Sequence, residues 1–277
     1  MLPTPYVMSD RVRVFYASCD DDLRGRIFFA DFEREPPFAL IAVGAEPVFD
    51  VGPEGAFDCD GVNPSQIIET ADGLALLYIG WRRGPAETPY TLFAGLAHSG
   101  DGGQSFTRQA EPFLPPRPGE RLFRTAPFIQ REGSDYRLLY IGGDVFVDAA
   151  GGRRSPIYSL MELRSDRLWD WAGPGRVLMA PDVAAGEVGF GRPVITPEGR
   201  LMVSLRTQTG YQLVETALDF EPGTRPSLTP LISPPFEAWE AGMTCFGARC
   251  TVGANDLLFY NGDGYGRTGM GLAWRPR

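Results

Sequence analysis

The sequence repeats itself five times, and this repeat limits the folds open to the chain. A short apolar run that closes in a turn recurs, centred on Tyr16, Tyr78, Tyr140, Ser204 and Tyr260. The steps between these residues are 62, 62, 64 and 56 residues. Self-similarity at a nearly fixed period is typical of architectures in which each repeat stacks against its neighbours.

Two further markers recur once in each copy of this repeat. The first is a pair of residues, with Pro second in four of five copies, and it precedes the run at Thr4-Pro5, Asn63-Pro64, Ala126-Pro127, Arg192-Pro193 and Phe246-Gly247. The second is a later apolar run at residues 27–32, 93–98, 158–163, 211–218 and 269–274. Each copy therefore holds three or four short strands, with almost no helical periodicity.

We predict an all-β fold, a five-bladed β-propeller that occupies residues 1–277 as a single domain. A propeller arranges four-stranded blades around a channel and leaves only short edges. The 34 Gly and 25 Pro supply the turns that such a fold needs. The first strand of each blade lines the channel, where proline is tolerated because that edge pairs with nothing on its axial side. A β-sandwich with chance similarity between segments is the alternative.

The residues that are missing exclude several kinds of chemistry. All 26 basic residues are Arg, so a Walker A lysine, a Schiff-base lysine and a Ser–Lys dyad are excluded. The single histidine, His98, excludes a His-rich zinc site, and its surroundings predict an exposed turn. Carboxylates, Arg, Tyr, Cys and a bound ion are left to carry any reaction.

Charge and segment composition suggest few macromolecular partners. A net charge of −9 argues against nucleic acid, and no run approaches the roughly 18 apolar residues of a membrane span. Residues 1–5 lack the features of a signal peptide, so we expect a cytoplasmic protein. The four cysteines, at positions 19, 59, 245 and 250, form no Cys-x-x-Cys pair, which predicts reduced thiols and no structural zinc. We expect no cofactor.

Several segments resemble known proteins. Residues 57–65 (Phe-Asp-Cys-Asp-Gly-Val-Asn-Pro-Ser) and 77–81 (Leu-Tyr-Ile-Gly-Trp) resemble five-bladed propellers related to glycoside hydrolase families 32, 43, 68 and 130. Residues 260–269 (Tyr-Asn-Gly-Asp-Gly-Tyr-Gly-Arg-Thr-Gly) are similar to the last blade of a group of glycosidase-like bacterial proteins. That group is often described only as predicted glycosyl hydrolases of surface-sugar gene clusters. Residues 16–20 and 239–245 also fit it, so the resemblance covers nearly the whole chain.

The chain also departs from these relatives. Gly242 stands where the group usually carries Glu, and Cys19 stands where a basic residue is expected. Residues 124–127 replace the segment that carries the acid Glu of family 43. Two function classes stay open. We predict the first, a carbohydrate-active enzyme that hydrolyses a glycoside through paired carboxylates in the axial pocket, with phosphorolysis as a variant. The second, the alternative, is a non-hydrolytic propeller that binds sugar or serves a biosynthetic cluster as a tailoring enzyme.

Hydrolysis of a glycoside needs two carboxyl groups across the scissile bond. Their separation is about 5–5.5 Å in a retaining enzyme and about 6.5–9.5 Å in an inverting one. We predict Asp60, Glu240 and Asp58 as catalytic residues, because each lies beside a marker of an inner strand. The alternatives are turn-capping for the two aspartates and a rim charge for Glu240. Two inward carboxylates at glycosidase spacing favour hydrolysis, and a channel lined by Arg, Thr, Cys and only one carboxylate favours the second class.

The remaining candidates are substrate-binding residues for a small carbohydrate-type ligand with hydroxyl or acidic groups. An arginine in a narrow channel needs an anion or a carboxylate partner, and an indole ring can stack on a sugar. Trp81 could equally pack within a blade, and the segment with Tyr265 could equally be a blade-closing loop. The candidates for substrate binding are Arg192, Arg124, Asp20, Glu187, Trp81, Tyr265 and Arg267.

Overall fold

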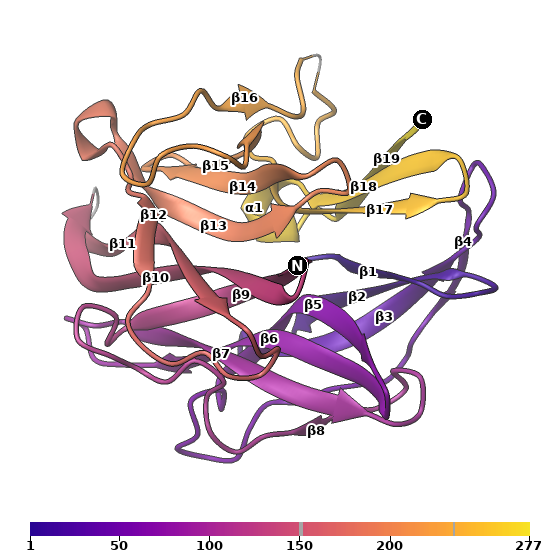
Figure 1. The fold of residues 1–277 in the computed structure, drawn as a ribbon, viewed down its shortest axis with the longest axis horizontal. Coiled ribbons are helices and arrows are strands. Elements are labelled where there is room, and N and C mark those ends of the chain that lie inside the picture. Colours follow the sequence, from indigo (N-terminus) through magenta and orange to yellow (C-terminus); the bar gives the residue numbers. More distant parts are fainter. Residues whose placement is uncertain (150–151, 235) are drawn as a thin grey trace.

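The strands of the computed structural model form successive antiparallel groups along the chain (Figure 1). The structure describes residues 1–149, 152–234 and 236–277. The first group contains β1 (Thr4–Val7), β2 (Val12–Cys19), β3 (Gly25–Phe32) and β4 (Leu40–Val43). The second contains β5 (Gly61–Thr70), β6 (Gly73–Arg83), β7 (Tyr90–Ser99) and β8 (Thr107–Arg108).

Three more groups follow in the described residues. The third contains β9 (Phe123–Glu132), β10 (Asp135–Ala149), β11 (Arg153–Ser165) and β12 (Arg176–Met179). The fourth contains β13 (Glu187–Ile195), β14 (Arg200–Thr207), β15 (Tyr211–Ala217) and β16 (Thr229–Pro230). The last group pairs β17 (Cys245–Val252), β18 (Asn255–Asn261) and β19 (Met270–Pro276). The chain is therefore all-β in its described parts, apart from the short helices η2 (Val183–Ala185) and α1 (Asp263–Gly266).

The first strands of the groups lie side by side in chain order. β1 contacts β5, β5 contacts β9, β9 contacts β13, β13 contacts β17, and β17 contacts β1. In Figure 1 the groups follow one another around the end marked N, which lies near the middle of the view. All five sequence markers that begin at residues 4, 63, 126, 192 and 246 lie on these first strands, as predicted. That the groups close into five blades stays a prediction.

The core lies between neighbouring groups. The middle strands are buried on both faces, and β6 is continuously buried from Leu74 to Gly80. Such strands need apolar residues at successive positions rather than an alternating pattern. The first and last groups also pack together, because Phe32 in β3 and Phe259 in β18 have ring centroids 5.5 Å apart.

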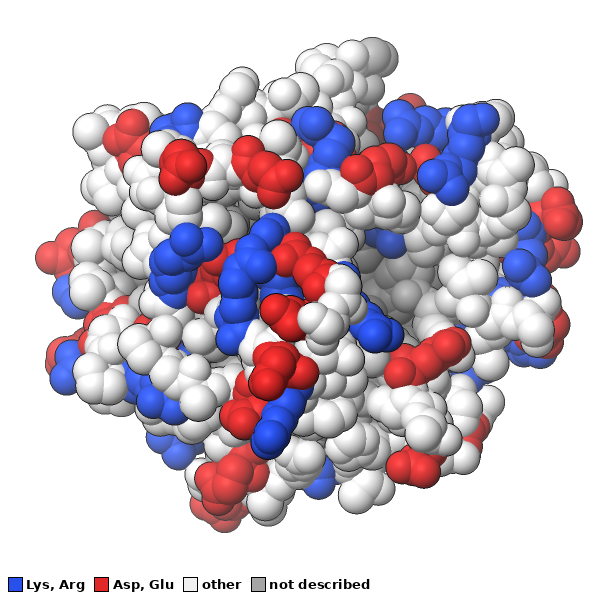
Figure 2. All heavy atoms as spheres, viewed as in Figure 1, with Lys and Arg blue, Asp and Glu red and all other residues white. Residues whose placement is uncertain are grey.

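The outer surface is charged and mixed. Figure 2 shows acidic and basic side chains interspersed over the face in view. His98 is exposed on β7, where its ring packs edge-on to Trp169 with centroids 6.4 Å apart. Among the described residues, no helix has the length and apolar character that a membrane crossing requires.

Candidate functional site

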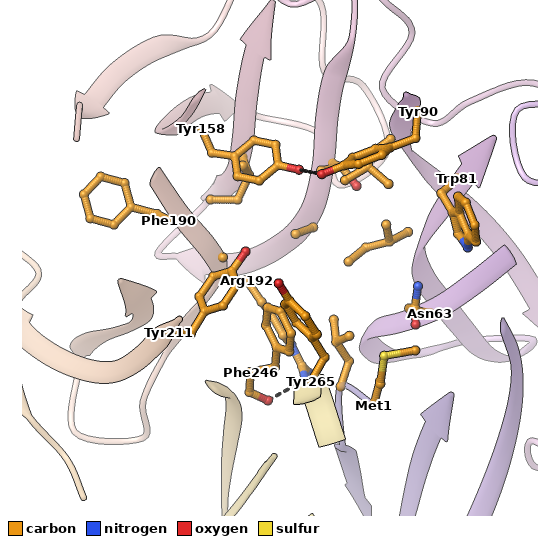
Figure 3. A pocket seen from close by; sticks show the side chains of 17 residues that line it. Met1, Asn63, Trp81, Tyr90, Tyr158, Phe190, Arg192, Tyr211, Phe246 and Tyr265 are labelled. Atoms are coloured by element: carbon orange, nitrogen blue, oxygen red, sulfur yellow. Dashed lines mark hydrogen bonds between the residues drawn. The ribbon is translucent and has the colours of Figure 1, made fainter. Parts of the chain in front are cut away.

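The first strands converge on a cavity of about 390 Å³, which we call the central pocket (Figure 3). Each strand group contributes to its lining, with Leu2 just ahead of β1, Asn63 on β5, Thr125 on β9, Arg192 on β13 and Phe246 on β17. A cavity where several strands meet is a common place for a ligand site, because each strand can supply one side chain.

The backbone around the central pocket is strained. Leu2, Ala126, Phe246 and Tyr265 all line it, and their φ angles are 52°, 52°, 52° and 63°. A left-handed conformation costs a residue with a side chain roughly 1–2 kcal/mol. The pairing of β9 with β10 and of β17 with β18 shifts register beside two of these residues. Bulges and strained residues of this kind re-aim side chains and are concentrated at functional sites.

Tyrosine side chains form much of the wall. Tyr90, Tyr158, Tyr211 and Tyr265 line the pocket, and the Tyr90 and Tyr158 hydroxyl oxygens lie 2.9 Å apart (Figure 3). The rings of Tyr211 and Tyr265 meet edge to face with centroids 5.9 Å apart. Burial raises the pKa of Tyr90, Tyr158 and Tyr211, so these hydroxyls stay protonated at neutral pH. The wall therefore offers apolar ring surface together with hydroxyl groups.

Trp81 occupies the pocket wall because Gly61 leaves room for it. The two residues pair across β5 and β6, and a Cβ atom on Gly61 would lie 1.7 Å from the indole Nε1. The Arg83 guanidinium lies over the indole ring, with its Cζ atom 5.5 Å from the ring centroid. Gly61 thus has a steric role in positioning the tryptophan.

Arg192 lies at the floor of the central pocket and is 3% exposed. Its guanidinium donates to the Pro3 carbonyl at 2.6 Å, to the Thr4 hydroxyl at 2.9 Å and to the Ser65 carbonyl at 2.7 Å. Burial lowers the pKa of Arg192 to about 9, so it is still charged at neutral pH. Arg192 also lines a second cavity of about 150 Å³, so it separates the two cavities.

Three buried polar atoms at the pocket lack hydrogen-bond partners within the described structure. They are Asn63 Oδ1, Thr125 Oγ1 and Arg192 Nε, from three successive first strands. Buried polar atoms are almost always paired in folded proteins, so these three atoms are available to pair with a ligand in the cavity. A ligand rich in hydroxyl groups has the matching donors and acceptors.

The predicted catalytic residue Asp58 lies inside the second strand group and is 1% exposed. It accepts a hydrogen bond from the Tyr78 hydroxyl at 2.9 Å, and its carboxylate lies 3.6 Å from Arg108 Nε. These contacts hold β6 and β8 to the loop that leads into β5. Asp58 is outside the lining of the central pocket.

The predicted catalytic residue Glu240 lies beside a tyrosine in the last group, as Asp58 does in the second group. It is buried, its Oε1 accepts a hydrogen bond from the Glu237 N–H at 3.3 Å, and burial together with this carboxylate raises the pKa of Tyr260. Glu120 and Tyr140 form the third example, with a hydroxyl-to-carboxylate distance of 2.5 Å. In each group the carboxylate precedes its tyrosine by 20 residues, so the pairing is a repeated feature of the fold.

Asp60 contacts the backbone of β6 at Trp81, which lines the pocket wall. Its backbone N–H donates to the Trp81 carbonyl at 3.2 Å, and its carboxylate accepts from the Arg83 N–H at 2.9 Å. Asp60, Asp58 and Glu240 all lie outside the lining of the central pocket. A catalytic role for these three residues stays a prediction.

Arg124 and Glu187 are buried in ion pairs. Arg124 Nε lies 3.0 Å from Glu120, and the guanidinium also donates to two backbone carbonyls. Glu187 pairs with Arg225 and accepts a hydrogen bond from the Asp182 N–H at 2.8 Å. Neither residue lines the central pocket.

Asp20 and Arg267 lie at the surface. Asp20 caps its own turn by accepting from the Arg24 N–H at 2.9 Å, and it pairs with Arg26. Arg267 follows α1 and is exposed beside the segment that carries Tyr265. Of the residues predicted from sequence, the pocket lining brings together Trp81, Arg192 and Tyr265.

The sequence reasoning missed three of the four wall tyrosines. Tyr90 begins β7, Tyr211 begins β15, and Tyr158 lies in β11, so each belongs to the third strand of its group. A tyrosine at this place in three successive copies was a signal that could have identified the wall. The first strands, where the repeated markers lie, supply the floor of the pocket.

The curated relatives are similar along almost the whole chain. No protein-family model matches the sequence. Two proteins of Mycobacterium tuberculosis, uncharacterized proteins MT1551 and Rv1502, are each 22% identical over 282 residues. The match covers 98% of this chain and 91% of either relative.

Solved structures with a similar fold are described as glycoside hydrolases. A glycosyl hydrolase from Bacteroides ovatus has a TM-score of 0.69 at 16% identity, over 100% of this chain and 85% of that one. A GH43_1 enzyme from Xanthomonas citri complexed with xylose has a TM-score of 0.64 at 15% identity. The match covers 99% of this chain and 86% of that one. A structure reported for the GH130 family of mannoside phosphorylases has a TM-score of 0.66 at 15% identity. The match covers 100% of this chain and 85% of that one. The fold-level resemblance inferred from the sequence segments is thereby confirmed.

Proposed function

We propose that the strand groups close into a five-bladed β-propeller whose central pocket binds a carbohydrate without hydrolysing it. The cyclic contacts of the first strands support the closure. The similarity to glycoside hydrolase structures supports a carbohydrate as the ligand class. This proposal selects the second of the two function classes left open by the sequence.

The lining of the central pocket is the observation that carries the proposal. It consists of aromatic rings, tyrosine hydroxyls, Asn63, Thr125, Arg192 and aliphatic side chains, and no carboxylate is among the described residues that line it. Sugars present apolar C–H faces that stack on aromatic rings and hydroxyl groups that pair with polar side chains. A paired-carboxylate mechanism needs two acids on opposite sides of the scissile bond.

Hydrolysis through Asp60 and Glu240 is the second candidate. The position of Asp60 beside Trp81 favours it, because a carboxylate there lies next to the wall on which a sugar would stack. If these residues are the acid and base, Asp60→Asn and Glu240→Gln each lower turnover by at least about 100-fold, the usual size of a general acid–base contribution.

Calorimetric titration with a panel of methyl glycosides tests the proposal, together with assays for release of p-nitrophenol from the matching p-nitrophenyl glycosides. We expect saturable binding of at least one glycoside and no turnover of any. Trp81→Ala should weaken that binding roughly tenfold, about 1.4 kcal/mol. Trp169→Ala is the matched control, since Trp169 is partly exposed and packs on His98 instead. Turnover that depends on Asp60 and Glu240 would establish the second candidate in its place.

A further inference from the structure

We infer that the central pocket selects a sugar that carries a negative charge. This inference rests on the proposed carbohydrate function and specifies its ligand class. The whole chain is acidic, with a net charge of −9, so an anionic ligand requires a local reversal of that charge. The arrangement of arginines around the pocket provides this reversal.

Most arginines of the protein are neutralised by carboxylates, and those at the pocket are not. Within the described residues, no carboxylate lies within ion-pair distance of Arg192 at the floor. Buried charge without a counter-ion is costly, and here only carbonyl and hydroxyl oxygens compensate for it. An anion in the cavity above would supply the missing opposite charge.

Arg206 adds a second positive charge behind the tyrosine wall. Its Cζ atom lies 5.6 Å from the ring centroid of Tyr158 and 5.8 Å from that of Tyr211, and both rings line the pocket. Its guanidinium donates only weakly, to the Pro156 carbonyl at 3.5 Å.

The tyrosine hydroxyls connect these charges to the ligand. They are protonated and therefore donate hydrogen bonds, which a carboxylate or phosphate oxygen accepts more strongly than a neutral hydroxyl does. Because the described lining contains no acid, an anionic group meets no repulsion there. Charge attraction is strengthened in such a cavity, since its low-polarity walls screen it less than water.

Matched pairs of probes test the inference by calorimetry. Each neutral methyl glycoside is compared with the methyl glycoside of its uronic acid and with its 6-phosphate, which separates a carboxylate from a phosphate as the anion. A hydrogen bond to a charged group contributes about 1.5–3 kcal/mol, so at least one acidic probe should bind about 10–100-fold tighter than its neutral partner. Rising salt should weaken binding of the acidic probe and leave the neutral probe unchanged.

Arg206→Gln removes one of the charges without touching the hydrogen bonds of the floor. We expect it to weaken binding of the acidic probe about tenfold more than binding of the neutral probe. Arg131→Gln is the control, since Arg131 also lacks a carboxylate partner in the described structure but lies at the far end of β9, bonded to the Gly133 carbonyl. Equal binding of neutral and acidic probes would overturn the charge selectivity and leave the carbohydrate function standing. No binding of either kind to the wild-type protein would overturn both.

Discussion

The Tyr78 hydroxyl donates a hydrogen bond to Asp58 across 2.9 Å within the second strand group. The same bond, at the same sequence separation, joins Tyr140 to Glu120 in the third group, and Glu240 stands 20 residues before Tyr260 in the last group and raises its pKa. A carboxylate that holds a buried tyrosine contributes to folding wherever it occurs, whether or not a ligand is bound. This repeated pair gives the two carboxylates a structural explanation that needs no substrate.

Replacing Asp58 should therefore lower stability rather than ligand affinity. Asp58→Ala leaves the buried Tyr78 hydroxyl without its acceptor, which costs about 1–3 kcal/mol in the free energy of unfolding. Denaturant unfolding measures this loss, and titration of a bound glycoside should give an affinity within about twofold of the wild type. A variant that unfolds normally but no longer turns over a glycoside would instead make Asp58 catalytic.

Arg192 should be among the most sensitive residues in the chain. It ties β13 to carbonyl and hydroxyl groups at β1 and β5, so Arg192→Gln leaves several buried acceptors without donors. We expect a loss of at least about 3 kcal/mol in unfolding free energy, since each orphaned group costs about 1–3 kcal/mol. Arg167→Gln, at an exposed arginine, should change stability by less than about 0.5 kcal/mol. Similar stability of the two variants would contradict this account of the floor.

Substitutions of Tyr265 by glycine and by alanine should differ in stability, and both should weaken ligand binding. Its φ of 63° is strained for tyrosine and easy for glycine, whereas alanine keeps the strain. We expect Tyr265→Gly to be more stable than Tyr265→Ala by about 1 kcal/mol, and both to bind the ligand more weakly than the wild type. Thermal unfolding and calorimetry give the two readings, and an alanine variant as stable as the glycine variant would rule out stored strain at this position.

Gly61 should be intolerant of even one methyl group. Gly61→Ala places a Cβ atom against the Trp81 indole, so the ring must leave its position in the pocket wall. We expect a change in tryptophan emission and a loss of ligand affinity of roughly tenfold, about 1.4 kcal/mol. Gly100→Ala is the control, because a Cβ atom there meets nothing within 4 Å. Unchanged emission and affinity in the Gly61 variant would show that Trp81 contributes nothing to the site.

The repeat made the strand groups predictable, but it could not show which side chains face the pocket. Asp58 and Glu240 lie close in sequence to first strands, yet their side chains turn into the groups. In a strand, a shift of one residue reverses the facing side, and β9 and β17 shift register beside Ala126 and Phe246. Their left-handed backbone has no sequence signal, since neither residue is glycine.

The tyrosines of the pocket wall could not be predicted from the sequence, for a different reason. Tyr90 and Tyr158 are separated by 68 residues and meet only because their strand groups lie next to each other. Aromatic residues at strand ends are typical of packing as well as of binding, so composition alone did not distinguish the two roles. Trp81 and Arg192 were predictable because each lies beside a repeated marker.

The central claim is that the central pocket holds the sugar, and a crystal soaked with the tightest-binding methyl glycoside tests it most directly. The account predicts sugar density between Trp81 and Tyr265, with hydroxyl or acidic oxygens within hydrogen-bond distance of the Tyr90 and Tyr158 hydroxyls. Density at an outer face, with the pocket unchanged, would contradict it.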